Sequence, residues 1–205
     1  MNTDHPHDNT KAALCQPHRL VLASRSPRRQ ELLLQAGLVF DIFPAEDSIE
    51  EPYDSCRFVS AAEFVERQAW LKAQNVAEQL ADPAAWILGC DTAVVCEGEI
   101  LGKPADRADA RRMLRKLAGT VHNVLSGLCL WTPLGIRQEV VETRLQMERL
   151  DDATLEAYLD TQKWVGKAGA FGYQDGNDWL RILSGTASNV VGLPIERVME
   201  WLAEA

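Results

Sequence analysis

Residues 20–37 read Leu-Val-Leu-Ala-Ser-Arg-Ser-Pro-Arg-Arg-Gln-Glu-Leu-Leu-Leu-Gln-Ala-Gly, and the rest of the chain is interpreted around this stretch. The apolar run 20–23 has the length of a buried strand, and Pro27 favours the first position of a following helix. Ser26 is expected to cap this helix and Gly37 to end it. A strand, a polar loop and a helix N-terminus together predict an anion site, because free N–H groups and the helix dipole attract negative charge.

Five side chains in this loop and in the first helical turn favour phosphate as the anion. They are the hydroxyls of Ser24 and Ser26 and the guanidinium groups of Arg25, Arg28 and Arg29. Guanidinium groups match the geometry of phosphate oxygens, although arginines at a helix start often only face solvent. The chain contains no Gly-x-x-x-x-Gly-Lys-Ser/Thr sequence, so the loop is not a P-loop.

Composition and charge restrict the classes of function. The 205 residues are 46% hydrophobic and 25% charged, which is ordinary for a globular protein. A formal net charge of −9 argues against non-specific binding to nucleic acid. Five cysteines without metal-site spacing fit free thiols in the cytoplasm, and no apolar run has the length of a membrane span. Residues 1–18 are expected to form a flexible tail before a single domain, residues 19–205.

An acidic segment follows the second expected strand, residues 39–43. Carboxylates stand at positions 46, 47, 50, 51 and 54. A solvated loop is one interpretation. A magnesium site is the other, because Mg²⁺ takes one or two protein carboxylates together with substrate phosphates. Position alone supports the two interpretations equally.

Two charged residues are predicted to lie inside the fold. Ser60 and Glu63 form a capping box that opens a long helix, and Lys72 falls on the apolar stripe of that helix. A lysine there must extend to solvent or meet an anion. Asp91 interrupts the apolar run 86–96, which is typical of a strand covered on both faces. A buried carboxylate is costly unless it is paired, binds metal or takes part in chemistry.

The remaining pattern predicts the fold class. Helices are expected after Asp106 and Asp151, and strands at 120–131, 136–147 and 179–184, before a last helix that begins near Pro194. Strands that alternate with helices and then give way to long antiparallel strands predict a mixed α/β sheet flanked by helices. The stretch 167–174, Lys-Ala-Gly-Ala-Phe-Gly-Tyr-Gln, has small residues that allow close backbone approach.

Three motifs stand in a fixed order along the chain. They are Ala23-Ser-Arg-Ser-Pro-Arg-Arg29, Gly89-Cys-Asp-Thr92 with Gly102-Lys-Pro104, and the stretch 167–174 with Val191-Gly-Leu-Pro194. In this order and spacing they closely resemble the Maf family of nucleoside triphosphate pyrophosphatases, over roughly residues 19–203. The resemblance implies an elongated mixed α/β fold, similar to inosine triphosphate pyrophosphatases, with two lobes around a cleft. It also implies hydrolysis of a nucleoside triphosphate to the monophosphate and pyrophosphate, with a divalent metal, Mg²⁺ or Mn²⁺.

The resemblance implies roles for individual residues. Asp91 looks like the catalytic carboxylate, and whether it is a general base or a metal ligand stays open. The positions that resemble substrate-binding residues are Ser24, Ser26, Arg28, Arg29, Lys72, Thr92, Lys103 and Gln174. The family's acidic residue before the long helix falls at Glu50 or Glu51, so the metal candidates are Glu50, Glu51 and Asp91. Because Lys72 is expected to contact the triphosphate, a Lys72→Met variant should bind nucleotide more weakly with unchanged or higher thermal stability.

The sequence leaves alternatives open for the preferred base and for the class of protein. Gln174 favours the branch that resembles dTTP/UTP pyrophosphatases over the 7-methyl-GTP branch, which usually has Glu there. The run Gln-Asp-Gly-Asn-Asp-Trp at 174–179 departs from the family pattern and leaves the base open. A regulatory nucleotide-binding protein would not need Asp91, and a haloacid dehalogenase phosphatase would need an Asp-x-Asp-x-Thr motif that this chain lacks at 91–95. A homodimer is compatible with the resemblance.

Overall fold

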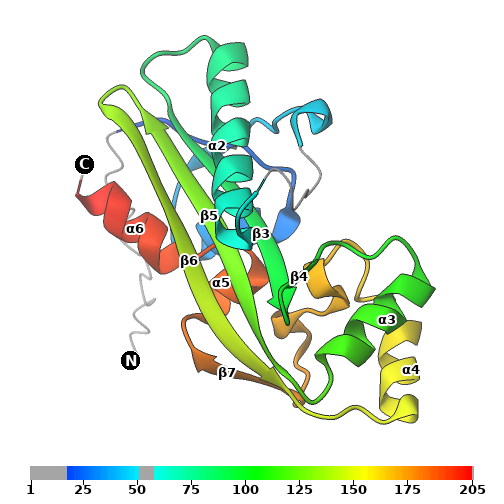
Figure 1. The fold of residues 1–205 in the computed structure, drawn as a ribbon. Coiled ribbons are helices and arrows are strands. Elements are labelled where there is room, and N and C mark those ends of the chain that lie inside the picture. Colours follow the sequence, from blue (N-terminus) through cyan, green and yellow to red (C-terminus); the bar gives the residue numbers. More distant parts are fainter. Residues whose placement is uncertain (1–17, 51–57, 205) are drawn as a thin grey trace, which may run out of the picture.

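A mixed β-sheet runs through the described part of the molecule (Figure 1). The computed structural model describes residues 18–50 and 58–204. The strand order is β2-β1-β3-β5-β6-β7, and β4 pairs with β3. β1 is parallel to both β2 and β3, whereas the other pairs are antiparallel. The strands are β1 (Leu20–Leu22), β2 (Phe40–Ile42), β3 (Trp86–Cys96), β4 (Glu99–Leu101), β5 (Val121–Thr132), β6 (Gly135–Met147) and β7 (Leu180–Ser184).

Helices lie on both faces of the sheet and beside its lower end (Figure 1). They are α1 (Pro27–Gln35), α2 (Ala61–Leu80), α3 (Arg107–Leu117), α4 (Asp152–Asp160), α5 (Ala187–Val191) and α6 (Ile195–Ala203), with short 3₁₀ turns η1 (Asp47–Ile49), η2 (Ala168–Ala170) and η3 (Tyr173–Asp175). Alternate residues of β1, β3 and β5 point to opposite faces. One set packs with α1 and α6, and the other packs with α2.

A third apolar core lies at the other end of the long strands. It joins β3, β5, β6 and β7 to α3, α4 and the turns η2 and η3. The prediction of an elongated mixed α/β sheet flanked by helices is therefore confirmed. No helix within the described ranges combines the length and apolar character needed to cross a membrane. The expected tail, residues 1–18, falls outside the described residues except for its last position.

Two glycines let α2 lie directly on the sheet. A Cβ atom built at Gly89 would lie 2.1 Å from the carbonyl oxygen of Ala69, and one at Gly127 would lie 2.1 Å from that of Val65. Gly89 is on β3 and Gly127 is on the neighbouring strand β5. Larger residues at these positions would push the helix away from the sheet. The close packing places Lys72 of α2 within reach of Asp91 on β3.

Local signals in the sequence define the starts of three helices. Ser60, Asp106 and Asp151 each accept a hydrogen bond from a backbone N–H in the first helical turn, as predicted. Ser26 holds the N-cap position of α1, but its side chain makes no capping bond, so that detail of the prediction is wrong. Instead, the N–H of Ser26 donates to the Oγ of Ser24 at 3.2 Å.

Candidate active site

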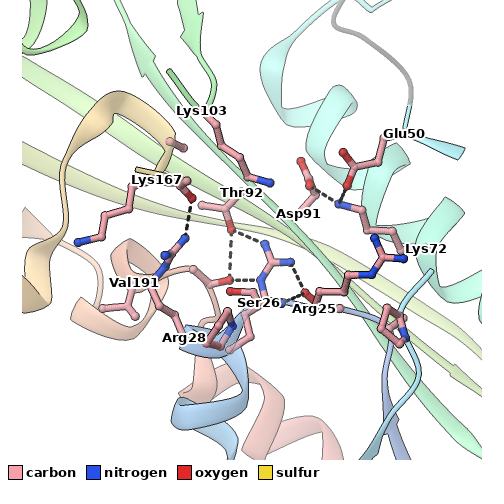
Figure 2. Close-up of a pocket in the computed structure, with 18 of the residues that line it drawn as sticks. Arg25, Ser26, Arg28, Glu50, Lys72, Asp91, Thr92, Lys103, Lys167 and Val191 are labelled. Carbon is pink, nitrogen blue, oxygen red and sulfur yellow. Dashed lines mark hydrogen bonds and ion pairs between the residues drawn. The ribbon is translucent and has the colours of Figure 1, made fainter. Parts of the chain in front are cut away.

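A pocket of about 500 Å³ opens where the loop after β1, the middle of β3 and the turns η2 and η3 converge (Figure 2). Its lining includes every described residue that the sequence indicated for substrate, catalysis or metal. These are Ser24, Ser26, Arg28, Arg29, Glu50, Lys72, Asp91, Thr92, Lys103 and Gln174. Glu51 lies outside the described residues. The structure therefore brings together residues from segments that are far apart in the chain.

Lys72 lies between two carboxylates at one side of the pocket. Its Nζ is 2.6 Å from Asp91 Oδ1 and 2.9 Å from Glu50 Oε1. The side chains of Lys72 and Asp91 are 9% and 19% exposed, whereas that of Glu50 is 52% exposed. Burial alone lowers the pKa of Lys72, but the charges of Asp91 and Glu50 outweigh it, and the net pKa is raised. The partly buried Asp91 is therefore paired, and the anion that Lys72 meets in this structure belongs to the protein.

The same carboxylates are suited to a metal ion that arrives with substrate. Within residues 18–50 and 58–204, no group of three or more His, Cys, Asp or Glu side chains could hold a metal ion. Glu50 and Asp91 are two carboxylates that meet at a single ammonium group. Mg²⁺ binds through one or two carboxylates plus substrate phosphates and retained water, so this donor set fits it. The residues that the structure describes do not by themselves supply a complete metal cage.

Further positive charge lines the pocket. Lys103 follows β4 and makes no hydrogen bond or ion pair with the described residues, and Figure 2 shows its ammonium reaching toward Asp91 and Thr92. Burial raises the pKa of Glu50, but the charges of Lys72 and Lys103 outweigh this effect and lower it. Arg25 and Asp47 form an exposed ion pair of 2.7 Å, and both residues line the pocket. Arg25 thus joins the loop after β1 to η1.

Arg29 is buried, and its guanidinium group donates hydrogen bonds to four groups of the protein. Its guanidinium donates to the carbonyl of Gly192 at 2.8 Å and to that of Cys90 at 2.7 Å. It also donates to Ser24 Oγ at 3.1 Å and to Thr92 Oγ1 at 3.2 Å. Four hydrogen bonds within the protein hold the guanidinium in place. Arg29 therefore supports the wall of the pocket in this structure rather than offering a free fork to an anion.

The hydroxyl of Thr92 is similarly engaged. Besides the bond from Arg29, it shares a hydrogen bond of 2.8 Å with Ser126 Oγ and donates to the carbonyl of Gly192 at 3.2 Å. A hydroxyl has one donor and two acceptor sites, so these partners use its full capacity. Thr92 lines the pocket, but in this structure its hydroxyl joins β3 to β5 and to the segment after α5.

A second side of the pocket holds Arg28 and the turn that carries Gln174. Arg28 Nη2 donates to the carbonyl of Gly166 at 2.9 Å, which connects α1 to the segment before η2. Burial lowers the pKa of Arg28, the neighbouring Arg29 adds to this effect, and Asp175 opposes it. Figure 2 shows Arg28 and Lys167 on the side of the pocket away from Lys72 and Glu50. The pocket thus has a carboxylate side and a Gln174 side.

Comparison with known proteins identifies the family. The family model described as Maf-like protein matches residues 19–205. The chain belongs to the Maf-like family. A dTTP/UTP pyrophosphatase of Rhodopirellula baltica is 48% identical over 189 residues, which cover 91% of this chain and 82% of that protein. The dTTP/UTP pyrophosphatase of Bordetella parapertussis is 40% identical over 208 residues, and 97% of each chain is covered.

A solved structure supports the fold. The HAM1 protein from Coxiella burnetii aligns with a TM-score of 0.51 at 16% sequence identity, and the alignment covers 92% of this chain and 100% of that one. At this level of identity the likeness concerns the fold alone. It agrees with the mixed sheet and flanking helices described above.

Sequence reasoning missed one cluster in this Maf-like site. Lys167, which lines the pocket, is paired with Asp175, and Asp175 also accepts a hydrogen bond from Tyr158. The sequence placed Asp175 in the run 174–179 that departs from the family pattern and gave it no role in the pocket. The only signal was a lysine beside a run of small residues, where a long charged side chain needs a partner.

Proposed function

We propose that this Maf-like protein hydrolyses nucleoside triphosphates to the monophosphate and pyrophosphate, with dTTP and UTP as its preferred substrates. One observation carries the proposal: a pocket of about 500 Å³ holds the partly buried Lys72–Asp91 pair together with Lys103, a cation without an ion-pair partner among the described residues. This volume is in the range of small-molecule sites. The substrate class is supported by relatives that are named dTTP/UTP pyrophosphatases and are 40–48% identical.

Asp91 is the residue proposed to act on the attacking water. Its carboxylate orients a water molecule and accepts its proton, while the water oxygen forms a bond to the α-phosphorus. The bond between the α-phosphorus and the bridging oxygen to the β-phosphorus breaks, and pyrophosphate leaves. Lys103, Arg28 and Lys72 line the pocket and would neutralise the negative charge of the triphosphate as this charge shifts, Lys72 in addition to its ion pairs with Glu50 and Asp91. No covalent intermediate with the protein is required.

A divalent cation is part of the proposal. Glu50 and Asp91 are the described residues that would hold it, and the sequence adds Glu51 as a further candidate. When bound, Mg²⁺ or Mn²⁺ would neutralise charge on the phosphate oxygens. Activity should therefore disappear with a chelator and return with added Mg²⁺. Full turnover after exhaustive chelation would contradict the metal part of the proposal but not the hydrolysis itself.

Gln174 is proposed to read the base. Its amide offers a donor and an acceptor, which suit the adjacent carbonyl and N–H on the edge of uracil or thymine. A site built on such a pair discriminates because the wrong base leaves polar groups unpaired. A glutamate would accept only, so Gln174→Glu should reduce the preference for UTP over 7-methyl-GTP by about 1–3 kcal/mol.

The test is a pyrophosphate-release screen over canonical and modified nucleoside triphosphates. We expect the highest kcat/KM for dTTP and UTP in the wild-type protein and a lower UTP to 7-methyl-GTP ratio in Gln174→Glu. Binding of nucleotide without release of pyrophosphate would favour a regulatory protein instead. A wild-type preference for 7-methyl-GTP, or an unchanged ratio in the variant, would contradict the assigned base specificity.

A further inference from the structure

A buried ion pair lies directly behind the residue proposed to read the base. The Lys167 ammonium donates to both carboxylate oxygens of Asp175, at 2.6 and 2.7 Å. The exposed fraction is 12% for the Lys167 side chain and 7% for that of Asp175. Breaking a pair this well buried leaves an uncompensated charge inside the protein, so its geometry is strongly favoured. Asp175 immediately follows Gln174 in η3.

Tyr158 connects this pair to the apolar core. Its hydroxyl donates to Asp175 Oδ2 at 2.8 Å, and its ring packs edge-on against Trp179 with 5.4 Å between ring centroids. Burial raises the pKa of Tyr158, and the bond to Asp175 raises it further, so the phenol remains a donor at physiological pH. Asp175 is thus fixed from α4 on one side and from Lys167 on the other.

The backbone of the turn closes tightly around the pair. The N–H of Asp175 donates to the carbonyl of Gly172 at 3.2 Å. A Cβ atom at Gly172 would lie 2.4 Å from Lys167 Nζ and 2.7 Å from Asp175 Oδ2. The backbone of the turn 172–175 therefore packs closely against the ion pair. Loss of the pair would remove contacts that hold this backbone in its conformation.

Gln174 has no comparable support of its own. Among the described residues, its side chain makes no hydrogen bond, and it is exposed on the wall of the pocket. The position of its amide is set by the backbone that carries it. Asp175 is the next residue in that backbone, and its carboxylate is bonded to Lys167 and Tyr158, so these contacts anchor the turn beside Gln174.

We propose that Asp175 is a positioning residue for base selectivity, which acts by fixing the turn that presents Gln174 and is supported by Lys167 and Tyr158. The inference rests on the proposed function, in which Gln174 reads the base. A displaced turn would weaken discrimination between bases, since small shifts of a recognition group reduce its contribution steeply. Asp175 does not contact the base in this role.

The test compares kcat/KM for UTP and 7-methyl-GTP, the two substrates that Gln174 is proposed to distinguish. We expect Asp175→Asn to lower the UTP to 7-methyl-GTP ratio by about tenfold. Tyr158→Phe removes one hydrogen bond and should lower the ratio by a smaller factor. Asp178→Asn is the matched control, because Asp178 is an exposed acid in the same loop, and its ratio should equal that of the wild type.

The outcomes separate this inference from the function on which it rests. An unchanged ratio in Gln174→Glu would show that Gln174 does not read the base, which contradicts the proposed function. A lowered ratio in Gln174→Glu with an unchanged ratio in Asp175→Asn would overturn the positioning role alone, whatever the change in Tm. Should Asp175→Asn fail to fold, the double variant Lys167→Gln/Asp175→Asn removes both charges, and an unchanged ratio in it would overturn the inference equally.

Discussion

Replacing Lys72 with methionine probes the ion pair on the carboxylate side of the pocket. The Lys72 Nζ lies 2.6 Å from Asp91 Oδ1, and the two side chains are 9% and 19% exposed. Methionine keeps most of the packing of the lysine stem but leaves the Asp91 carboxylate without its partner. Removing one member of a buried pair costs about 3–5 kcal/mol. Because Asp91 keeps some exposure, we expect the lower end, about 3 kcal/mol.

Thermal unfolding in the absence of nucleotide and metal measures this loss. For a chain of this size, about 3 kcal/mol corresponds to a decrease in Tm of about 6–12 °C. The double variant Lys72→Met/Asp91→Asn, in which neither charge remains, should recover most of the decrease. A Lys72→Met protein with the Tm of the wild type would refute the argument that Asp91 depends on Lys72.

The pH dependence of this difference follows from the pKa of Lys72. The folded-state pKa is raised above the ordinary value of 10.5. The stabilisation is therefore complete below pH 10.5 and is lost as the pH rises through the folded-state pKa. The free energies of unfolding of wild type and Lys72→Met should differ by a constant amount near neutral pH and converge in strongly alkaline buffer. A difference that vanished near pH 8 would contradict this assignment.

Two further predictions concern single titratable groups. Asp91→Asn should lower kcat by about 10²- to 10⁴-fold while the protein remains folded, because a positioned acid–base group contributes that much. Near-wild-type turnover would rule out a catalytic role. Burial lowers the pKa of His122 from 6.5 to about 4, so the unfolded chain takes up a proton first as the pH falls. The wild type should lose about 3 kcal/mol between pH 6.5 and 4, and His122→Leu should lack that part of the loss, as measured by urea unfolding at each pH.

The sequence correctly predicted several elements whose ends or burial are determined by neighbouring residues. Ser60 and Asp106 cap helices in the way their spacing predicts, and the apolar run 86–96 is one strand with Asp91 in its middle. The helix α5 was not predicted, because its five residues carry no apolar periodicity. It is held by contacts from distant strands: Asn189 donates to the carbonyls of Val124 and Val141.

The direction of charged side chains could not be predicted from residue type. Lys72 was expected to contact a substrate anion, so Lys72→Met was expected to have unchanged or higher thermal stability. The structure gives it two protein carboxylates, and the expected sign of the stability change is reversed. Arg29 was assigned to the phosphate loop by its place in a motif. In the structure, the Arg29 guanidinium donates to the carbonyl of Gly192, which lies 163 positions away in the chain. A local motif does not reveal a contact with so distant a residue.

The bonds of Arg29 also have a consequence for folding kinetics. They join α1 to β3, 61 positions along the chain, and to the segment before α6, 163 positions along it. Contacts between such distant segments carry a large loop-closure entropy and form after local structure. The pocket is therefore completed only when the C-terminal segment docks. During refolding, the helical signal should return before enzymatic activity, and the interval between the two reports the time this docking takes.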